Sequence, residues 1–351
     1  MSASDDQLWA VVLAGGVGSR FWPMSTPARP KQLLPLVTGK PLLVDAIDRL
    51  APIVDPAHTL VLTNASLVKP IRALLPPVPR ENIIAEPKPA GTAAALTWAA
   101  LTIERRDGKD ATMISIHADW AIGDDAEFRE VLLEGEKVAR TTHTLVTVGI
   151  VPTRADQGFG YIQPSHPDRQ GGSPVKRFVE KPDLDLAEKL RGEGYLWNSG
   201  IFVWTVGDFL AQVRQHAREL QKALSLDADA DASEFFGSVA KPISIDSSVL
   251  ERSKNVTVLA GKFGWDDVGT WAALGRVGDK DEFGNVTSGN VHMLDSADNV
   301  VHVNDGRVVM YGVDNLVVVV HDGLTLVTTT EKAADLKRLI ESLPSKEKGD
   351  A

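Results

Sequence analysis

A glycine-rich turn followed by two cations is the part of this chain best suited to chemistry. The turn, Leu13-Ala-Gly-Gly-Val-Gly-Ser-Arg20, follows an apolar run, and Lys31 stands further on in a proline-rich stretch. Glycines let a backbone approach a ligand closely, because no Cβ blocks the way. Arginine and lysine can neutralise phosphate oxygens. The combination predicts a polyphosphate site with Arg20 and Lys31 as its cations.

Two common glycine loops do not match this turn. A Walker-type loop needs a lysine at a fixed spacing after its first glycine, and none stands there. The dinucleotide fingerprint begins well at Gly16 and Gly18 but has Phe21 in place of its third glycine. A turn that only reverses the chain is the structural alternative.

A carboxylate follows another apolar run. Asp119 comes shortly after Thr112–Ile116, which predicts a carboxylate at the carboxyl end of a buried strand. That is a suitable place for a metal ligand, although an aspartate there could also cap the next helix.

Alternating strands and helices must position these residues. Strands are expected at Leu8–Leu13, Thr59–Thr63, Thr112–Ile116, Thr144–Val148 and Ile201–Trp204. Helices are expected at Pro41–Leu50, Ala93–Arg106, Phe128–Thr141 and Val206–Leu224. The alternation predicts an α/β sheet with helices on both faces. Ligands of such sheets sit outside the carboxyl ends of the strands, where the glycine turn falls.

The pattern changes near residue 284. Short β-rich runs separated by turn signals follow, including a buried strand at Val317–Val320. Thr328 and Glu331 have the spacing of a capping box. An apolar stripe then predicts a terminal helix, with Leu336, Leu339, Ile340 and Leu343. We therefore predict a catalytic domain at 1–283 and a small β domain with a terminal helix at 284–351.

Composition narrows the classes of protein. The 351-residue chain has no cysteine, so it has no disulfide or thiolate metal site. We find no signal peptide and no membrane span, and we expect a cytoplasmic protein. A net charge of −10 argues against nucleic acid as a partner. Anionic substrates would have to be held by local cations and a metal ion.

The motifs resemble those of the sugar-1-phosphate nucleotidylyltransferases, and among them the mannose-1-phosphate guanylyltransferases. Their signature G-G-x-G-x-R is filled by the glycine turn, followed by Pro23 and by P-K-x-x-x-P at 30–35. Further matches keep the family's order at Glu86-Pro87, 147–153, 159–162, 178–182, 197–202 and 265–271.

The resemblance implies a fold and a reaction. The fold would be a Rossmann-like nucleotidyltransferase domain with a mixed, mostly parallel sheet, followed by a short β-helix-like domain. The reaction would join GTP and mannose 1-phosphate into GDP-mannose and pyrophosphate, assisted by Mg²⁺ or Mn²⁺. The attacking phosphate oxygen is already deprotonated, so no general base is required. We expect a monofunctional chain, because the isomerase domain of the long relatives would not fit. Whether it forms a homodimer is left open.

The resemblance also implies roles for individual residues. Arg20 and Lys31 are the catalytic cations, and Asp119 and Asp267 are the metal ligands. The sugar phosphate would be bound by Gly160, Glu180, Lys181, Asn198 and Gly200. The nucleotide would be bound by Leu13, Ala14, Gly15, Gly16, Gly18, Glu86, Gly91 and Thr92.

The chain departs from the family at two places. Relatives usually read Ala-Asp-His, whereas here His117 precedes Asp119, so we expect His117 to be structural. Relatives usually carry Arg-Asn before Thr92, and here Ala90-Gly91 stand instead. The alternatives of the same class are another sugar phosphate, such as heptose or glucose 1-phosphate, or another nucleotide. The alternatives of a different class are a catalytically silent nucleotide-sugar sensor and a dehydrogenase.

Overall fold

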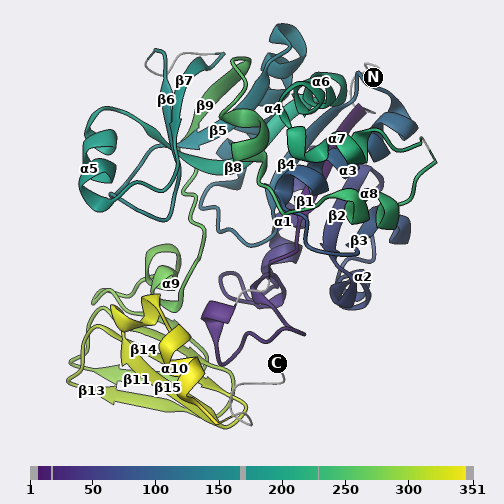
Figure 1. Ribbon diagram of the computed structural model, residues 1–351. Coiled ribbons are helices and arrows are strands. Elements are labelled where there is room, and N and C mark those ends of the chain that lie inside the picture. The colour runs from purple at the N-terminus through teal and green to yellow at the C-terminus, as the bar shows by residue number, and fades with distance from the viewer. Residues whose placement is uncertain (1–6, 17–18, 167–170, 228, 345–351) are drawn as a thin grey trace. The chain divides into compact units, whose positions relative to one another are not determined.

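The computed structural model describes residues 7–16, 19–166, 171–227 and 229–344. They form two compact units, coloured along the chain in Figure 1. The first unit comprises Met1–Gly15, Ile47–Ala118 and Asp124–Trp265. The second comprises Gly16–Ala46, Asp119–Gly123 and Asp266–Ala351. Because the second unit also takes in two early segments, the domain boundary at residue 283 stays a prediction.

A mixed sheet organises the first unit. Within the described residues its nine strands lie in the order β3-β2-β1-β4-β8-β5-β9-β7-β6. Strands β3, β2, β1 and β4 are parallel, β8 runs antiparallel between β4 and β5, and β6 and β7 form an antiparallel edge. The strand bounds are β1 Leu8–Leu13, β2 Thr59–Asn64, β3 Ile83–Glu86, β4 Thr112–His117, β5 Leu145–Ile150, β6 Tyr161–Pro164, β7 Ser173–Val179, β8 Leu196–Thr205 and β9 Val256–Gly261. The predicted Rossmann-like fold is confirmed.

Helices cover both faces of this sheet (Figure 1). Gly135 of α4 (Asp125–Thr142) lies against Val203 on one face. The neighbours of Val203 in β8, Phe202 and Trp204, point to the opposite face, where they join the core of α3 (Thr92–Asp107) and α6 (Val206–His216). The other helices are α2 Val68–Leu74, α5 Leu184–Gly192, α7 Gln221–Leu224 and α8 Ala232–Ser238, while α1 spans Leu42–Leu50. No described helix combines the length and the apolar character needed to cross a membrane.

Two elements differ from expectation. The helix predicted at Val206–Leu224 is interrupted, because Ala217 takes a non-helical backbone conformation after α6 and a 3-10 turn precedes α7. Strand β8 begins at Leu196 and not at Ile201, since its first residues pair with β5 beyond a register shift at Val148 and Gly149. This extension places Asn198 on a strand.

In the carboxyl-terminal part of the second unit the chain winds through short strands that stack into sheets (Figure 1), and this region is called the coil below. Strands β10, β12 and β14 stack in parallel, with Val286 opposite Val300 and Val300 opposite Val317. Strands β11 and β13 stack in the same way in a second sheet. The bounds are β10 Val286–Ser288, β11 Val291–Leu294, β12 Val300–Val303, β13 Val308–Tyr311, β14 Leu316–His321 and β15 Leu324–Thr329. A β-rich region of short strands ending in a helix is confirmed.

The start of the terminal helix differs from the prediction. Thr328 lies in β15, which pairs antiparallel with β14, so it cannot begin a helix. The helix α10 (Lys337–Ser342) starts later, after a 3-10 turn, and Leu336 at its N-cap makes no side-chain cap. The capping-box prediction is wrong, because strand pairing at the end of the coil overrides the local pattern.

An aromatic core joins the early and late segments of the second unit. Phe21 packs edge-on against Trp271, the first residue of α9 (Trp271–Val277), with ring centroids 5.1 Å apart. The indole of Trp271 also donates a hydrogen bond to the carbonyl oxygen of Trp22 at 2.9 Å. Val300 and Val317 of the coil belong to the same buried cluster. This core anchors the segment that carries Arg20 and Lys31.

Candidate active site

The turn after β1 is held by the neighbouring strand β2. The buried residues Leu13 and Ala14 end the apolar run, and Ala14 N–H donates to the carbonyl oxygen of Leu62 at 2.8 Å. The Thr63 hydroxyl donates to the Ala14 carbonyl, and the Asn64 amide donates to the Gly15 carbonyl, both at 3.0 Å. Side chains of β2 thus occupy the turn's carbonyl oxygens.

Glu86 stands beside this turn at the end of β3. A Cβ added at Gly15 would lie 3.3 Å from Glu86 Oε1, which is tighter than ordinary contact. Burial raises the pKa of Glu86 to about 7. The structure therefore brings Gly15 and Glu86 together and leaves the glutamate able to change charge near neutral pH.

The segment after Glu86 is closed by its own packing. Gly91 has φ +85°, and a side chain there would overlap the backbone of Ile243. The hydroxyl of Thr92 accepts a hydrogen bond from Ile245 N–H at 3.0 Å. Gly91 and Thr92 therefore have structural contacts of their own, and their predicted role in nucleotide binding stays a prediction.

Lys31 is the centre of a charged cluster in the second unit. It begins the short 3-10 helix Lys31–Leu33, and its side chain is only 8% exposed. Its Nζ donates to Asp119 Oδ2 at 2.9 Å and to the carbonyl oxygen of Asp267 at 2.5 Å. A buried ammonium needs such acceptors, because burial penalises an uncompensated charge. The structure thus brings a predicted cation together with both predicted metal ligands.

Backbone pairing explains why these distant segments meet. Ala121 N–H donates to the Asp266 carbonyl at 2.9 Å, and Asp266 N–H donates back at 3.1 Å. These two bonds tie the segment that follows Asp119 to the segment that carries Asp267.

The turn at Asp267 is strained and braced. Val268 has φ 44°, a left-handed conformation that a β-branched residue rarely adopts. The buried Asp266 accepts a hydrogen bond from Val268 N–H at 2.9 Å. Arg276 donates two hydrogen bonds, of 2.7 and 3.0 Å, to the same carboxylate. Asp266 and Arg276 therefore shape the backbone that presents Asp267.

The donor set of this cluster fits a hard divalent cation. The Asp119 side chain is 34% exposed, and among the described residues only its Oδ2 makes a hydrogen bond. Mg²⁺ typically takes one or two carboxylates and completes its shell with water and phosphate oxygens. Within the described ranges, no three His, Asp or Glu side chains could hold an ion by themselves. Asp119 and Asp267 fit an ion that a bound phosphate helps to hold.

The other predicted residues of the glycine turn are differently placed. Arg20 is exposed in the 3-10 helix Ser19–Phe21, and its guanidinium makes no ion pair with a described residue. Gly16 is exposed, and its carbonyl accepts a hydrogen bond from the Gln32 amide at 3.0 Å. Gly18 lies outside the described residues. Gln32, which the motif leaves unspecified, thus fixes the turn beside Lys31.

The predicted sugar residues gather on the antiparallel side of the first unit. Asn198 N–H donates to the Gly160 carbonyl at 2.8 Å, and a Cβ at Gly160 would lie 2.8 Å from Glu180 Oε2. The exposed Lys181 lies 3.2 Å from Glu180. Gly200 N–H points at the side-chain oxygen of Asn198, 3.4 Å away. All five residues therefore belong to one cluster.

A model of the nucleotidyl transferase family matches residues 9–282. The chain belongs to the nucleotidyl transferase family. A mannose-1-phosphate guanylyltransferase of Klebsiella pneumoniae is 33% identical, over 98% of this chain and 75% of the relative. One from Salmonella muenchen is 32% identical over the same shares. A crystal structure described as mannose-1-phosphate geranyltransferase from Thermus thermophilus superposes with a TM-score of 0.89, at 32% identity, covering 95% of this chain and 98% of that one.

An aromatic layer supports two of the predicted sugar residues of this nucleotidyl transferase. Phe159 packs between Trp197 and Trp265, with ring centroids 5.0 and 5.2 Å away. The Arg154 guanidinium lies 4.9 Å from the Trp197 ring centroid and forms an ion pair with Asp156 at 2.7 Å. Because Phe159 precedes Gly160 and Trp197 precedes Asn198, this layer restrains both of these residues.

Sequence reasoning missed Asp246. Its carboxylate accepts a hydrogen bond from Asn198 Nδ2 at 2.7 Å. Burial and the nearby Glu180 raise the pKa of Asp246, while the Asn198 hydrogen bond and His117 lower it. No local motif marks this aspartate, since its partner stands far away in the chain.

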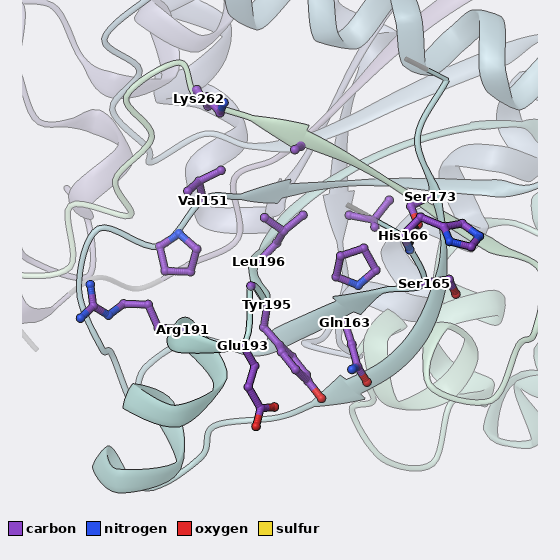
Figure 2. A pocket seen from close by; sticks show the side chains of 15 residues that line it. Val151, Gln163, Ser165, His166, Ser173, Arg191, Glu193, Tyr195, Leu196 and Lys262 are labelled. Atoms are coloured by element: carbon purple, nitrogen blue, oxygen red, sulfur yellow. Dashed lines mark hydrogen bonds between the residues drawn. The ribbon is translucent and has the colours of Figure 1, made fainter. Parts of the chain in front are cut away.

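Figure 2 shows a separate cavity of this nucleotidyl transferase. It has a volume of about 470 Å³ and lies in the first unit, where β6, β8 and β9 contribute Gln163, Leu196 and Val258. Its lining shares no residue with the predicted site. Concavity alone would therefore have pointed away from the residues that the family motifs select.

Proposed function

We propose that this chain transfers a guanylyl group from GTP to mannose 1-phosphate, giving GDP-mannose and pyrophosphate. The observation that carries the proposal is the cluster of Lys31, Asp119 and Asp267 in a chain whose relatives bear the name of this activity. The cluster has the charges that joining two polyanions requires.

The reaction calls for alignment and neutralisation of charge. An oxygen of the sugar phosphate attacks the α-phosphorus of GTP, and the bond from that phosphorus to the pyrophosphate oxygen breaks. The attacking oxygen needs no base, because the second pKa of a phosphate monoester is about 6. Donors and cations that face the developing charge supply most of the catalysis in such transfers.

Lys31 and Arg20 take the cationic roles. Lys31 is held in place by its two hydrogen bonds, so its Nζ can donate to a phosphate oxygen without a large reorganisation. The exposed Arg20 can turn its guanidinium fork toward the leaving pyrophosphate. Asp119 and Asp267 would hold Mg²⁺, or Mn²⁺, which when bound neutralises phosphate charge.

The remaining residues read the two substrates. Ionised Glu86 can accept hydrogen bonds from the edge of guanine, and this requires loss of its proton near pH 7. Glu180 and Asn198 can bind sugar hydroxyls, and Lys181 can meet the sugar phosphate. Backbone groups at Gly160 and Gly200 would complete the sugar subsite.

A substrate panel tests this proposal. The purified chain is incubated with four nucleoside triphosphates crossed with mannose, glucose and heptose 1-phosphates, and pyrophosphate release is measured with Mg²⁺. We expect the highest kcat/KM with GTP and mannose 1-phosphate. A higher value with another pair would overturn the substrate assignment, and binding without turnover for every pair would indicate a silent sensor.

A further inference from the structure

Asp246 lies outside the motifs named in the sequence analysis. It begins the π-helical turn Asp246–Leu250 in the first unit and is half-buried. Its only hydrogen bond from a described side chain comes from Asn198 Nδ2, at 2.7 Å. The contact joins Asp246 to the predicted sugar subsite.

The Asn198 amide is held at both ends. Its Nδ2 faces the Asp246 carboxylate, and its Oδ1 faces Gly200 N–H at 3.4 Å. A carboxylate only accepts hydrogen bonds, so it selects the NH₂ end of the amide. One N–H and one oxygen lone pair of Asn198 then stay available in fixed directions.

Asp246 is itself fixed by the segment that leads to it. Ile243 exchanges backbone hydrogen bonds with Ala90 and Ala93, at 3.1 and 3.2 Å. Ile245 N–H donates to the Thr92 hydroxyl at 3.0 Å. This segment therefore reaches Asp246 from a braced position at the start of α3, which fixes the backbone next to Asp246.

We infer that Asp246 is a positioning residue of the sugar subsite, which orients the Asn198 amide and thereby sets how the subsite tells one sugar from another. The inference rests on the proposed function. Glu180 and Asp246 add carboxylate oxygens beside the side-chain oxygen of Asn198, so the subsite offers several hydrogen-bond acceptors. Such a surface suits the hydroxyl groups of a neutral sugar.

The test compares Asp246→Ala, Asp246→Asn and a control, Glu188→Ala, which removes an exposed charge on α5. We expect Asp246→Ala to raise KM for the sugar phosphate about tenfold, as for one lost hydrogen bond. KM for GTP should stay within about twofold, since we assign Asn198 to the sugar subsite and not to the nucleotide. The ratio of kcat/KM for mannose 1-phosphate over glucose 1-phosphate, its C2 epimer, should fall. Asp246→Asn should keep KM for the sugar phosphate close to the wild-type value, because an amide oxygen can still accept a hydrogen bond from Asn198.

A double-mutant cycle guards against a purely structural effect. If Asp246 acts through Asn198, adding Asp246→Ala to Asn198→Ala should leave KM for the sugar phosphate unchanged. Equal changes in KM for both substrates, an unchanged epimer ratio, or additive effects in the cycle would overturn the inference. If wild type prefers another sugar phosphate, that compound and its epimer replace the pair. Absence of wild-type turnover would instead reject the proposed function.

Discussion

The cluster around Lys31 and the cluster of predicted sugar residues differ in how their charges are arranged. In the second unit, Lys31 lies between the Asp119 carboxylate and the Asp267 carbonyl, so opposite charges are paired. In the first unit, burial and the like charge of the nearby Glu180 raise the pKa of Asp246, and Glu180 itself pairs with the exposed Lys181 at 3.2 Å. Among the described side chains, only the amide of Asn198 bonds to the Asp246 carboxylate.

The difference matches two kinds of ligand. A cluster of paired charges can exchange one partner for a phosphate oxygen or a metal ion and stay compensated. A cluster rich in carboxylate and amide oxygens suits the hydroxyl groups of a sugar, and the exposed Lys181 beside it can meet a phosphate. The chain thus offers two different chemical environments, one in each unit.

The largest effect should come from the acidic part of the paired cluster. We expect Asp267→Asn to lower kcat by about 10²–10³, as for loss of one electrostatic contact in a transition state. The fold should be retained, because Lys31 bonds to the backbone carbonyl of Asp267. Turnover is measured at saturating Mg²⁺ beside Asp279→Asn, an exposed aspartate of the same unit. Wild-type turnover in the first variant would exclude Asp267 as a metal ligand.

The cation of the same cluster should have the next largest effect. We expect Lys31→Ala to lower kcat by about 10–10², and more than it weakens GTP binding, because the ammonium acts mainly on transition-state charge. Steady-state kinetics and calorimetric GTP binding separate the two quantities. Lys332→Ala, an exposed lysine of the same unit, is the control. A defect confined to GTP binding would show that Lys31 does not stabilise the transition state.

Glu86 should make the recognition of the nucleotide depend on pH. Its pKa of about 7 means that KM for GTP should fall several-fold as pH rises through 7 and the carboxylate forms. Glu86→Gln should abolish this dependence. A wild-type profile that is equally flat would show that Glu86 does not read the base.

The same carboxyl also affects folding, with the opposite sign. Between its ordinary pKa of 4.5 and the raised value of about 7, the folded chain keeps a proton that the unfolded chain has released. The free energy of unfolding therefore falls as pH rises across this window, by at most about 3 kcal/mol. Urea unfolding of wild type and Glu86→Gln at both ends of the window measures it. A wild type that gains stability with pH relative to the variant would contradict the shift.

The smallest effect should come from the hydrogen bonds that Arg276 makes under the Asp267 turn, and it should appear in the stability of the fold. We expect Arg276→Gln to lower the free energy of unfolding by about 1–2 kcal/mol, because it removes a bidentate pair to the buried Asp266 while Arg276 itself is partly exposed. Thermal unfolding is compared with Arg252→Gln, which breaks a similar pair whose carboxylate, Glu219, is 34% exposed where Asp266 is 7% exposed. Equal losses in both variants would show that burial of Asp266 adds nothing.

The pattern of apolar and polar residues predicted the central strands and the helices between them. The buried runs of β1, β2 and β4 alternate with amphipathic helices, so their type and order were readable. The edge strands β6 and β7 were not, because both contain proline and are only partly buried, and β6 has only four residues. The capping box at Thr328 failed because antiparallel pairing with β14 outweighs a four-residue signal.

The same distinction applies to the site. Lys31, Asp119 and Asp267 were predictable because the family motifs contain them, and the structure brings them together. Asp246 was not, since its importance lies in a contact across 48 residues of chain. The backbone strain at Val268 likewise exists only in the folded turn.

The close approach of Ile243 to Gly91 has an evolutionary consequence. Any side chain at position 91 would collide with the Ile243 backbone, whatever its chemistry. A lineage with a bulkier residue at 91 must therefore also have rerouted the segment around 243, and a single substitution cannot convert one arrangement into the other. Among relatives, we expect the residue type at 91 to covary with the length or course of that segment. Attempts to redirect base preference should exchange both segments together.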